Sequence, residues 1–176
     1  MGQDDAFTTS DGCAISFTVR AAPNAGTPRI VLIHSLALDR SIWDEVAAGL
    51  ENEAAVLTYD CRGHGRSDRR AGAFTAELFA RDLAELFDHV GWQSATVAGC
   101  SMGGCVALAF TGLYPERANR LGLIDTTAAY DAVAATQFRD RAAAALAKGR
   151  AFVSRLPTVR RHARAAASGA MRVGAS

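Results

Sequence analysis

A serine held in a glycine-rich turn is the residue of this sequence best suited to nucleophilic chemistry. The pentapeptide G-C-S-M-G at 99–103 lies between an apolar run at 94–98 and a second apolar run at 102–113. The first run predicts a short buried strand and the second a helix, so Ser101 falls on the sharp turn between them. Glycines leave room where strand and helix backbones approach each other, and the helix N-terminus offers unpaired N–H groups to a developing oxyanion. The pattern predicts a serine nucleophile.

Two upstream loops follow further predicted strands. The run 29–34 is typical of a strand buried on both faces, and His34 at its end is interpreted as a structural histidine that fixes the following loop rather than as a base. A strand at 54–59 leads into the loop 60–68, where carboxylates and arginines alternate. We interpret this loop as a scaffold whose charged residues pair with one another and with turn amides. The alternative is a metal site formed by Asp60, His64 and Asp68.

The rest of the chain predicts an α/β fold with a mostly parallel sheet and helices on both faces. The expected elements are a hairpin of the runs 7–10 and 13–20 with the two-residue turn Asp11-Gly12, a helix at 42–50 capped by Ser41, a helix at 75–90, and a last strand at 121–124. On the longer helix, the apolar residues recur at helical spacing. Its charged residues are expected to face water, namely Arg81, Asp82, Glu85 and Asp88.

Three motifs together resemble the front half of an α/β-hydrolase, closest to the 3-oxoadipate enol-lactonase-like branch. They are I-H-S-L-A-L-D-R-S-I-W-D from residue 33, Y-D-C-R-G-H-G-R-S-D from residue 59, and V-A-G-C-S-M-G-G-C-V-A from residue 97. The resemblance covers residues 7–130. It implies that Ser101 is the nucleophile and that the backbone N–H groups of Leu36 and Met102 are oxyanion donors, with Ser35 as the alternative to Leu36. Ala37 stands where the branch commonly has glycine.

A serine hydrolase also needs a base and an acid, which follow the nucleophile in the order acid, histidine in this fold. His162 is the only histidine after Ser101, and it lies in a basic, alanine-rich stretch. Asp125, at the end of the last predicted strand, is the acid candidate, and a plain polar turn is the alternative for it. We expect the sheet to be truncated after its sixth strand and the acid and histidine of the family to be missing. The chain is then an inactive or impaired hydrolase.

Charge divides the chain into two parts. Residues 1–138 hold 10 basic and 17 acidic residues, whereas residues 139–176 hold 9 basic residues and one acidic residue. We expect 1–130 to form the N-terminal part of a hydrolase core, and 131–176 to be a helical or disordered tail, either the start of a cap or the product of a frameshift or truncation. The tail has few aromatic residues and no nucleic-acid motif, so nucleic-acid and membrane partners are not expected.

The predicted function is hydrolysis of a small carboxylic ester or lactone through an acyl-serine intermediate, without cofactor or metal. One alternative is a non-catalytic fragment with a basic tail, and another is a small complete esterase that uses Asp125 and His162. The open edge of the last strand is expected to favour self-association. Four cysteines without metal spacing and a polar N-terminus predict free thiols in a cytoplasmic protein, with a packing role for Cys100.

Overall fold

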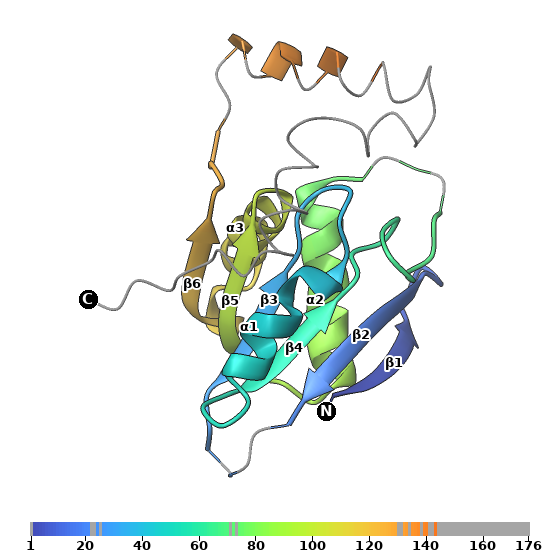
Figure 1. The fold of residues 1–176 in the computed structure, drawn as a ribbon. Coiled ribbons are helices and arrows are strands. Elements are labelled where there is room, and N and C mark those ends of the chain that lie inside the picture. Colours follow the sequence, from blue (N-terminus) through green and yellow to red (C-terminus); the bar gives the residue numbers. More distant parts are fainter. Residues whose placement is uncertain are drawn as a thin grey trace, which may run out of the picture. The chain divides into compact units, whose positions relative to one another are not determined.

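The computed structural model describes residues 2–21, 24, 26–70, 72, 74–129, 132–133, 135–137, 139–140 and 143 of the 176-residue chain. The chain divides into two units, Met1–Ala128 and Ala129–Ser176. In the second unit, the described residues 132–133, 135–137, 139–140 and 143 are helical. The sheet and the helices that cover it belong to the first unit (Figure 1).

A six-stranded sheet forms the centre of the first unit, in the order β1-β2-β4-β3-β5-β6. The strands β1 and β2 pair antiparallel, as do β2 and β4, whereas β3 pairs parallel with β4 and β5, and β5 with β6. The predicted mostly parallel sheet is therefore confirmed. The strands are β1 Gln3–Thr8, β2 Ala14–Arg20, β3 Arg29–Ile33, β4 Ala55–Tyr59, β5 Ala95–Cys100 and β6 Ala118–Ile124.

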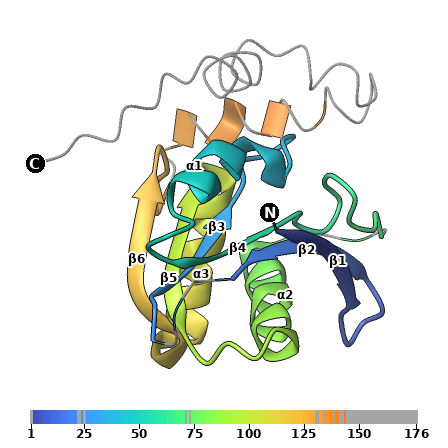
Figure 2. The ribbon, with the colours of Figure 1, turned by 60° about the horizontal axis from the view of Figure 1, so that its bottom comes forward.

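Helices cover both faces of this sheet (Figures 1 and 2). On one face lie α2, Ala76–His89, and α3, Met102–Leu113, which bury the larger apolar cluster against the strands. On the other face lie the 3₁₀ helix η1, Arg40–Trp43, and α1, Asp44–Gly49, which bury a smaller cluster. The 3₁₀ helix η2, Pro115–Arg117, joins α3 to β6. The central strands are apolar on both faces because both faces are covered.

The opening hairpin has a wider turn than predicted. The strands end and begin at Thr8 and Ala14, so the connection is longer than the two-residue turn that was expected. Thr9 closes it, because its N–H donates to the carbonyl oxygen of Cys13 at 2.9 Å and its hydroxyl accepts from the N–H of Cys13 at 2.9 Å. Side-chain bonding by Thr9 thus overrides the local preference of the Asp11-Gly12 pair.

The helix predicted at 42–50 is also divided differently. The chain first makes η1, and its cap is Asp39 rather than Ser41, since the Asp39 carboxylate accepts from the N–H of Ser41 at 2.9 Å. The α-helix itself begins two residues later than predicted, at Asp44. Asp39 was not considered as a cap, because the 3₁₀ turn that it caps begins two residues before the predicted helix.

Asp82 of α2 is buried, contrary to the prediction that it faces water. Its carboxylate accepts two hydrogen bonds from Arg62, from Nε at 2.6 Å and from Nη2 at 2.5 Å. Arg62 also pairs with the half-exposed Asp11 at 2.8 Å. Asp82 lies three residues after Phe79 and four before Leu86, so it shares the apolar side of the helix. Helical spacing alone could have predicted that Asp82 faces inward. There its bonds to Arg62 join the loop after β4 to α2.

Asp82→Asn should lower the free energy of unfolding by about 3 kcal/mol, because Arg62 then stays buried without its full counter-charge. Asp88 is a matched control on the same helix, since it pairs with Arg117 at 2.7 Å but its side chain is 71% exposed. Asp88→Asn should cost under about 1 kcal/mol. Urea unfolding followed by circular dichroism measures both. Equal losses in the two variants would show that the buried pair contributes no more than the surface pair.

Candidate active site

Ser101 occupies the turn between β5 and α3 in a strained backbone conformation. Its φ is 52° and its ψ is −112°, and its side chain does not cap the helix that follows. A residue other than glycine held in such a region costs about 1–3 kcal/mol, so the surrounding structure must impose the conformation. The side chain is partly buried. The predicted strand, turn and helix are therefore present, with the serine at the bend.

Glycines make this turn possible because they lack side chains. A Cβ atom on Gly99 would lie 2.1 Å from the carbonyl oxygen of Gly103, and one on Gly103 would lie 2.3 Å from the carbonyl oxygen of Ile33. Both obstacles are backbone atoms, which cannot rotate out of the way. The first turn of α3 is thus in direct contact with the end of β3.

The register of the sheet places the loop after β3 beside this turn. Ile33 of β3 lies opposite Gly99 of β5, and Leu36 and Met102 each lie three residues further along their segments. Met102 is the first residue of α3, so its N–H has no partner within the helix. The two residues expected to donate to an oxyanion therefore lie on segments that leave neighbouring strands at the same edge of the sheet.

The loop that carries Leu36 contains a second strained residue. A hydrogen bond from the N–H of Leu38 to the carbonyl oxygen of Ser35, at 3.2 Å, closes a four-residue turn. Ala37 has a φ of 60° in this turn. Glycine adopts such a φ without steric cost, whereas a Cβ atom makes it unfavourable. The departure from glycine noted in the sequence therefore lies where the backbone conformation favours glycine.

His34 joins the loops after β3 and β4. Its ring is fully buried, and its Nε2 accepts the N–H of Cys61 at 2.9 Å. The other nitrogen, Nδ1, therefore carries the proton and donates to the carbonyl oxygen of Ser35 at 2.8 Å. Burial lowers the pKa of His34 to about 4. His34 is neutral at pH 7 with both nitrogens occupied, which confirms the structural role predicted for it.

The remaining histidines occupy different places. His64 lies beside His34, with ring centres 5.1 Å apart, and its Nδ1 is 3.1 Å from the carbonyl oxygen of Arg62. His89 is the last residue of α2 and stacks on Phe7 at 5.3 Å. Because α2 leads into the start of β5, His89 lies toward the sheet edge opposite Ser101. His162, the predicted candidate for the base, lies outside the described residues.

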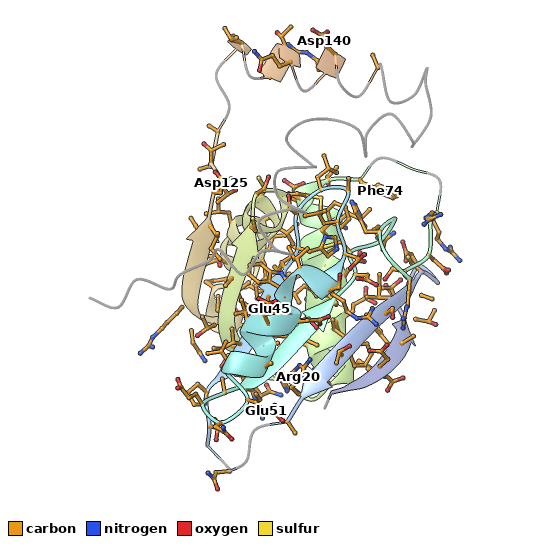
Figure 3. All side chains as sticks on the ribbon, in the orientation of Figure 1. Arg20, Glu45, Glu51, Phe74, Asp125 and Asp140 are labelled. Atoms are coloured by element: carbon orange, nitrogen blue, oxygen red, sulfur yellow. The ribbon has the colours of Figure 1, made fainter. Side chains whose placement is uncertain are left out.

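Asp125 directly follows β6, at the carboxyl end of that strand (Figure 3). The N–H of Ser101 donates to the carbonyl oxygen of Ile124 at 3.0 Å, which extends the pairing of β5 and β6 by one residue. Asp125 follows Ile124 directly, is exposed, and has a φ of 47°. The structure thus brings Asp125 to the sheet edge that holds Ser101, as the sequence predicted.

Cys100 precedes Ser101 but is buried in the core, where it belongs to the cluster that contains Trp43 and Ala47. Burial raises the pKa of its thiol, and the carboxylate of Asp125 raises it further. A thiol that stays protonated is a poor nucleophile. The packing role predicted for Cys100 is therefore confirmed.

The loop after β4 is held by ion pairs and by a bond to a turn amide, as predicted, but the partners in its ion pairs lie outside the loop rather than within it. Asp60 is buried and accepts from the guanidinium of Arg40 at 2.7 Å, from the N–H of Arg40 at 2.8 Å, and from the N–H of Arg66 at 2.9 Å. Arg66 itself pairs with Asp4 at 2.6 Å. Arg40 was not predicted as a partner of Asp60. The two residues meet because they follow β3 and β4, which are neighbours in the sheet.

No group of three or more His, Cys, Asp or Glu residues in the part described could hold a metal ion. None of the helices described there is long and apolar enough to cross a membrane.

Known proteins with similar sequences and structures have the same fold. A family model described as the alpha/beta hydrolase fold matches residues 28–162. The 3-oxoadipate enol-lactonase 2 of Acinetobacter baylyi is 29% identical over 135 residues, which are 77% of this chain and 49% of the relative. The chain thus spans about half the length of this curated relative.

Two solved structures share the fold. A hydrolase from Pseudomonas aeruginosa has a TM-score of 0.76 and 28% identity, with 91% of this chain and 65% of that chain covered. The enol-lactonase from Burkholderia xenovorans has a TM-score of 0.71 and 28% identity, with 95% of this chain and 65% of that chain covered. The segments that carry Ser101 and the loop after β3 lie inside the region matched by the family model.

The buried, neutral state of His34 predicts a loss of stability on acidification. The unfolded chain takes up a proton on this histidine below a pH of about 6.5, whereas the folded chain does so only near its pKa of about 4. Free energy of unfolding should therefore fall as the pH is lowered through that window. In His34→Gln, whose side chain does not titrate, this contribution is absent. Urea unfolding at several pH values measures the difference, and parallel pH profiles for the two proteins would contradict it.

Proposed function

This chain belongs to the α/β-hydrolase family, and on that premise we propose that Ser101 is the nucleophile of a hydrolase that acts on a small carboxylic ester or lactone. The strained conformation of Ser101 is the observation that carries the proposal, because such strain persists where the surrounding structure is built to present a side chain. The enol-lactonases among the similar proteins favour a lactone or small ester as the substrate class.

The chemistry follows from what meets at this edge of the sheet. The hydroxyl oxygen of Ser101 attacks the carbonyl carbon of the substrate, and its proton leaves to a base. Negative charge then develops on the carbonyl oxygen, and the N–H groups of Leu36 and Met102 are the proposed donors to it. Expulsion of the alcohol oxygen gives an acyl-serine, which water hydrolyses. For a lactone, the leaving oxygen stays attached to the acyl group.

We propose that this reaction is slow in this chain, because the three described histidines are all engaged elsewhere. His34 has both ring nitrogens engaged and a pKa of about 4, so it cannot accept the proton of Ser101 at neutral pH. His89 stacks on Phe7 at the end of α2, and His64 is held against His34 and the carbonyl of Arg62. Oxyanion donors and substrate binding alone still give about 10³–10⁴-fold acceleration over water.

Hydrolysis of p-nitrophenyl acetate tests the proposal, because this activated ester requires little help from a base. The wild-type chain should turn it over slowly but steadily, and Ser101→Ala should be clearly slower, because the acyl-serine can no longer form. Ser94→Ala is a matched control, since Ser94 lies directly before β5 at the opposite end of the strand, and it should act like the wild type. Equal rates for wild type and Ser101→Ala would refute the proposal.

The same assay separates the alternative of a small complete esterase. If Asp125 and His162 complete a triad with Ser101, His162→Ala should lose as much activity as Ser101→Ala, because residues that act as one unit give non-additive losses. If the chain works without that histidine, His162→Ala should retain the wild-type rate.

We also propose that the free edge of β6 pairs with a second copy of the chain. Within the described sheet β6 is the end strand, with β5 as its neighbour. Two leucines of β6, Leu121 and Leu123, are 38% and 47% exposed. An edge strand with unpaired N–H and C=O groups and apolar side chains favours pairing with another chain.

Sedimentation velocity over a range of protein concentrations tests this association. Leu123→Lys should shift the protein toward monomer, because a charge on the edge strand opposes pairing. Leu113→Lys is the matched control, since Leu113 is 49% exposed on α3 and not on the edge, and it should sediment like the wild type. A wild-type protein that stays monomeric at every concentration would contradict the proposal.

A further inference from the structure

The last residue of β6 and a residue two positions later bond to the strained serine through its backbone N–H and C=O groups. The N–H of Ser101 donates to the carbonyl oxygen of Ile124 at 3.0 Å. The hydroxyl of Thr126 donates to the carbonyl oxygen of Ser101 at 2.8 Å. Both backbone polar groups of the proposed nucleophile are therefore bonded to residues that lie two positions apart on one segment.

The carbonyl group of Ser101 accepts the first hydrogen bonds of α3. Besides the hydroxyl of Thr126, it accepts the N–H of Gly104 at 3.0 Å and the N–H of Cys105 at 3.2 Å. A peptide unit is planar and trans, so the direction of its C=O determines the direction of its N–H. The N–H of this peptide belongs to Met102, the proposed oxyanion donor. The bond from Thr126 therefore orients that N–H.

Packing and backbone geometry place Thr126 where it can make this bond. A Cβ atom on Gly104 would lie 2.4 Å from Cγ2 of Thr126, so the absence of a side chain at Gly104 lets Thr126 approach the helix. The Sγ atom of Cys105 lies 3.7 Å from the Thr126 hydroxyl oxygen. Asp125, with its φ of 47°, turns the chain at the end of β6. None of these features is needed for pairing of β6 with β5.

We propose that Thr126 is a positioning residue for the hydrolysis. Its hydroxyl holds the Ser101–Met102 peptide, so that Ser101 keeps its strained conformation and the N–H of Met102 stays directed at the oxyanion. This inference rests on the proposed function of Ser101. Without the hydroxyl, the carbonyl of Ser101 retains its two helical donors but loses the contact with the segment after β6, and the turn relaxes.

Three variants separate the hydroxyl from other properties of Thr126. Thr126→Val has nearly the same shape but no hydroxyl, and Thr126→Ser keeps the hydroxyl but loses the methyl group. Thr111→Val is the matched control on α3, because the hydroxyl of Thr111 donates to the carbonyl oxygen of Ala107 at 2.9 Å, remote from the turn. It removes the same kind of hydrogen bond without touching Ser101.

The readout is the rate at which a small alkyl fluorophosphonate labels Ser101, measured at several probe concentrations so that the maximal rate and the binding constant are separated. The oxygen of Ser101 bonds to phosphorus, fluoride leaves, and the serine proton goes to solvent. Thr126→Val should lower the maximal rate roughly 10- to 100-fold with little change in the binding constant, as expected for a misplaced reacting group. Thr126→Ser should restore most of that rate, and Thr111→Val should label like the wild type.

A Thr126→Val protein that labels as fast as the wild type would overturn the proposal. So would equal losses in Thr126→Val and Thr111→Val, which indicate general weakening of α3, and so would a failure of Thr126→Ser to restore the rate.

Amide hydrogen exchange of residues 98–106 provides a readout that does not depend on activity. The segment should exchange faster in Thr126→Val than in Thr111→Val if Thr126 holds the turn, and equal exchange in the two variants would overturn that part of the proposal. A wild-type chain that labels no faster than Ser101→Ala would refute the proposed function, and the exchange measurement would then decide by itself whether Thr126 holds the turn.

Discussion

The positive φ of Ser101 is the constraint on which the rest of the structure depends. Such a conformation does not persist in an isolated strand–helix unit, because it costs about 1–3 kcal/mol. It is imposed by backbone neighbours on both sides: the end of β3, which contacts Gly103, and the end of β6, which accepts the N–H of Ser101. The turn therefore needs β5 to lie between two parallel strands, which is its place in this sheet.

A second requirement is that the loops at this edge of the sheet keep fixed positions relative to one another. Buried polar contacts between distant segments hold them in place. Neutral His34 bonds to the loops after β3 and β4. In the loop after β4, Asp60 pairs with Arg40, and Arg62 pairs with Asp82 of α2. A buried polar group is costly unless it is paired, so each of these contacts favours one arrangement of the loops over the alternatives.

The expectations that failed share a physical cause. Asp82 was placed in water because it is charged, yet its position beside the apolar residues of α2 and its pairing with Arg62 outweigh the cost of burial. The turn of the opening hairpin was assigned from Asp11-Gly12, but the hydroxyl of Thr9 closes a longer one. In both places a side chain found a hydrogen-bond partner that local propensity does not describe. The strands and the helix around Ser101 were predicted well because their apolar runs are continuous.

The sequence by itself determined the strand–turn–helix unit, the serine at its bend and the mostly parallel sheet, since glycine spacing and hydrophobic periodicity are local properties of the chain. Only the tertiary structure decided which side chains hold that unit. Thr126 bonds to Ser101 across 25 residues, Arg62 to Asp82 across 20, and Arg62 to Asp11 across 51. These partners depend on the order of the strands, which brings distant segments to one edge and which no local pattern encodes.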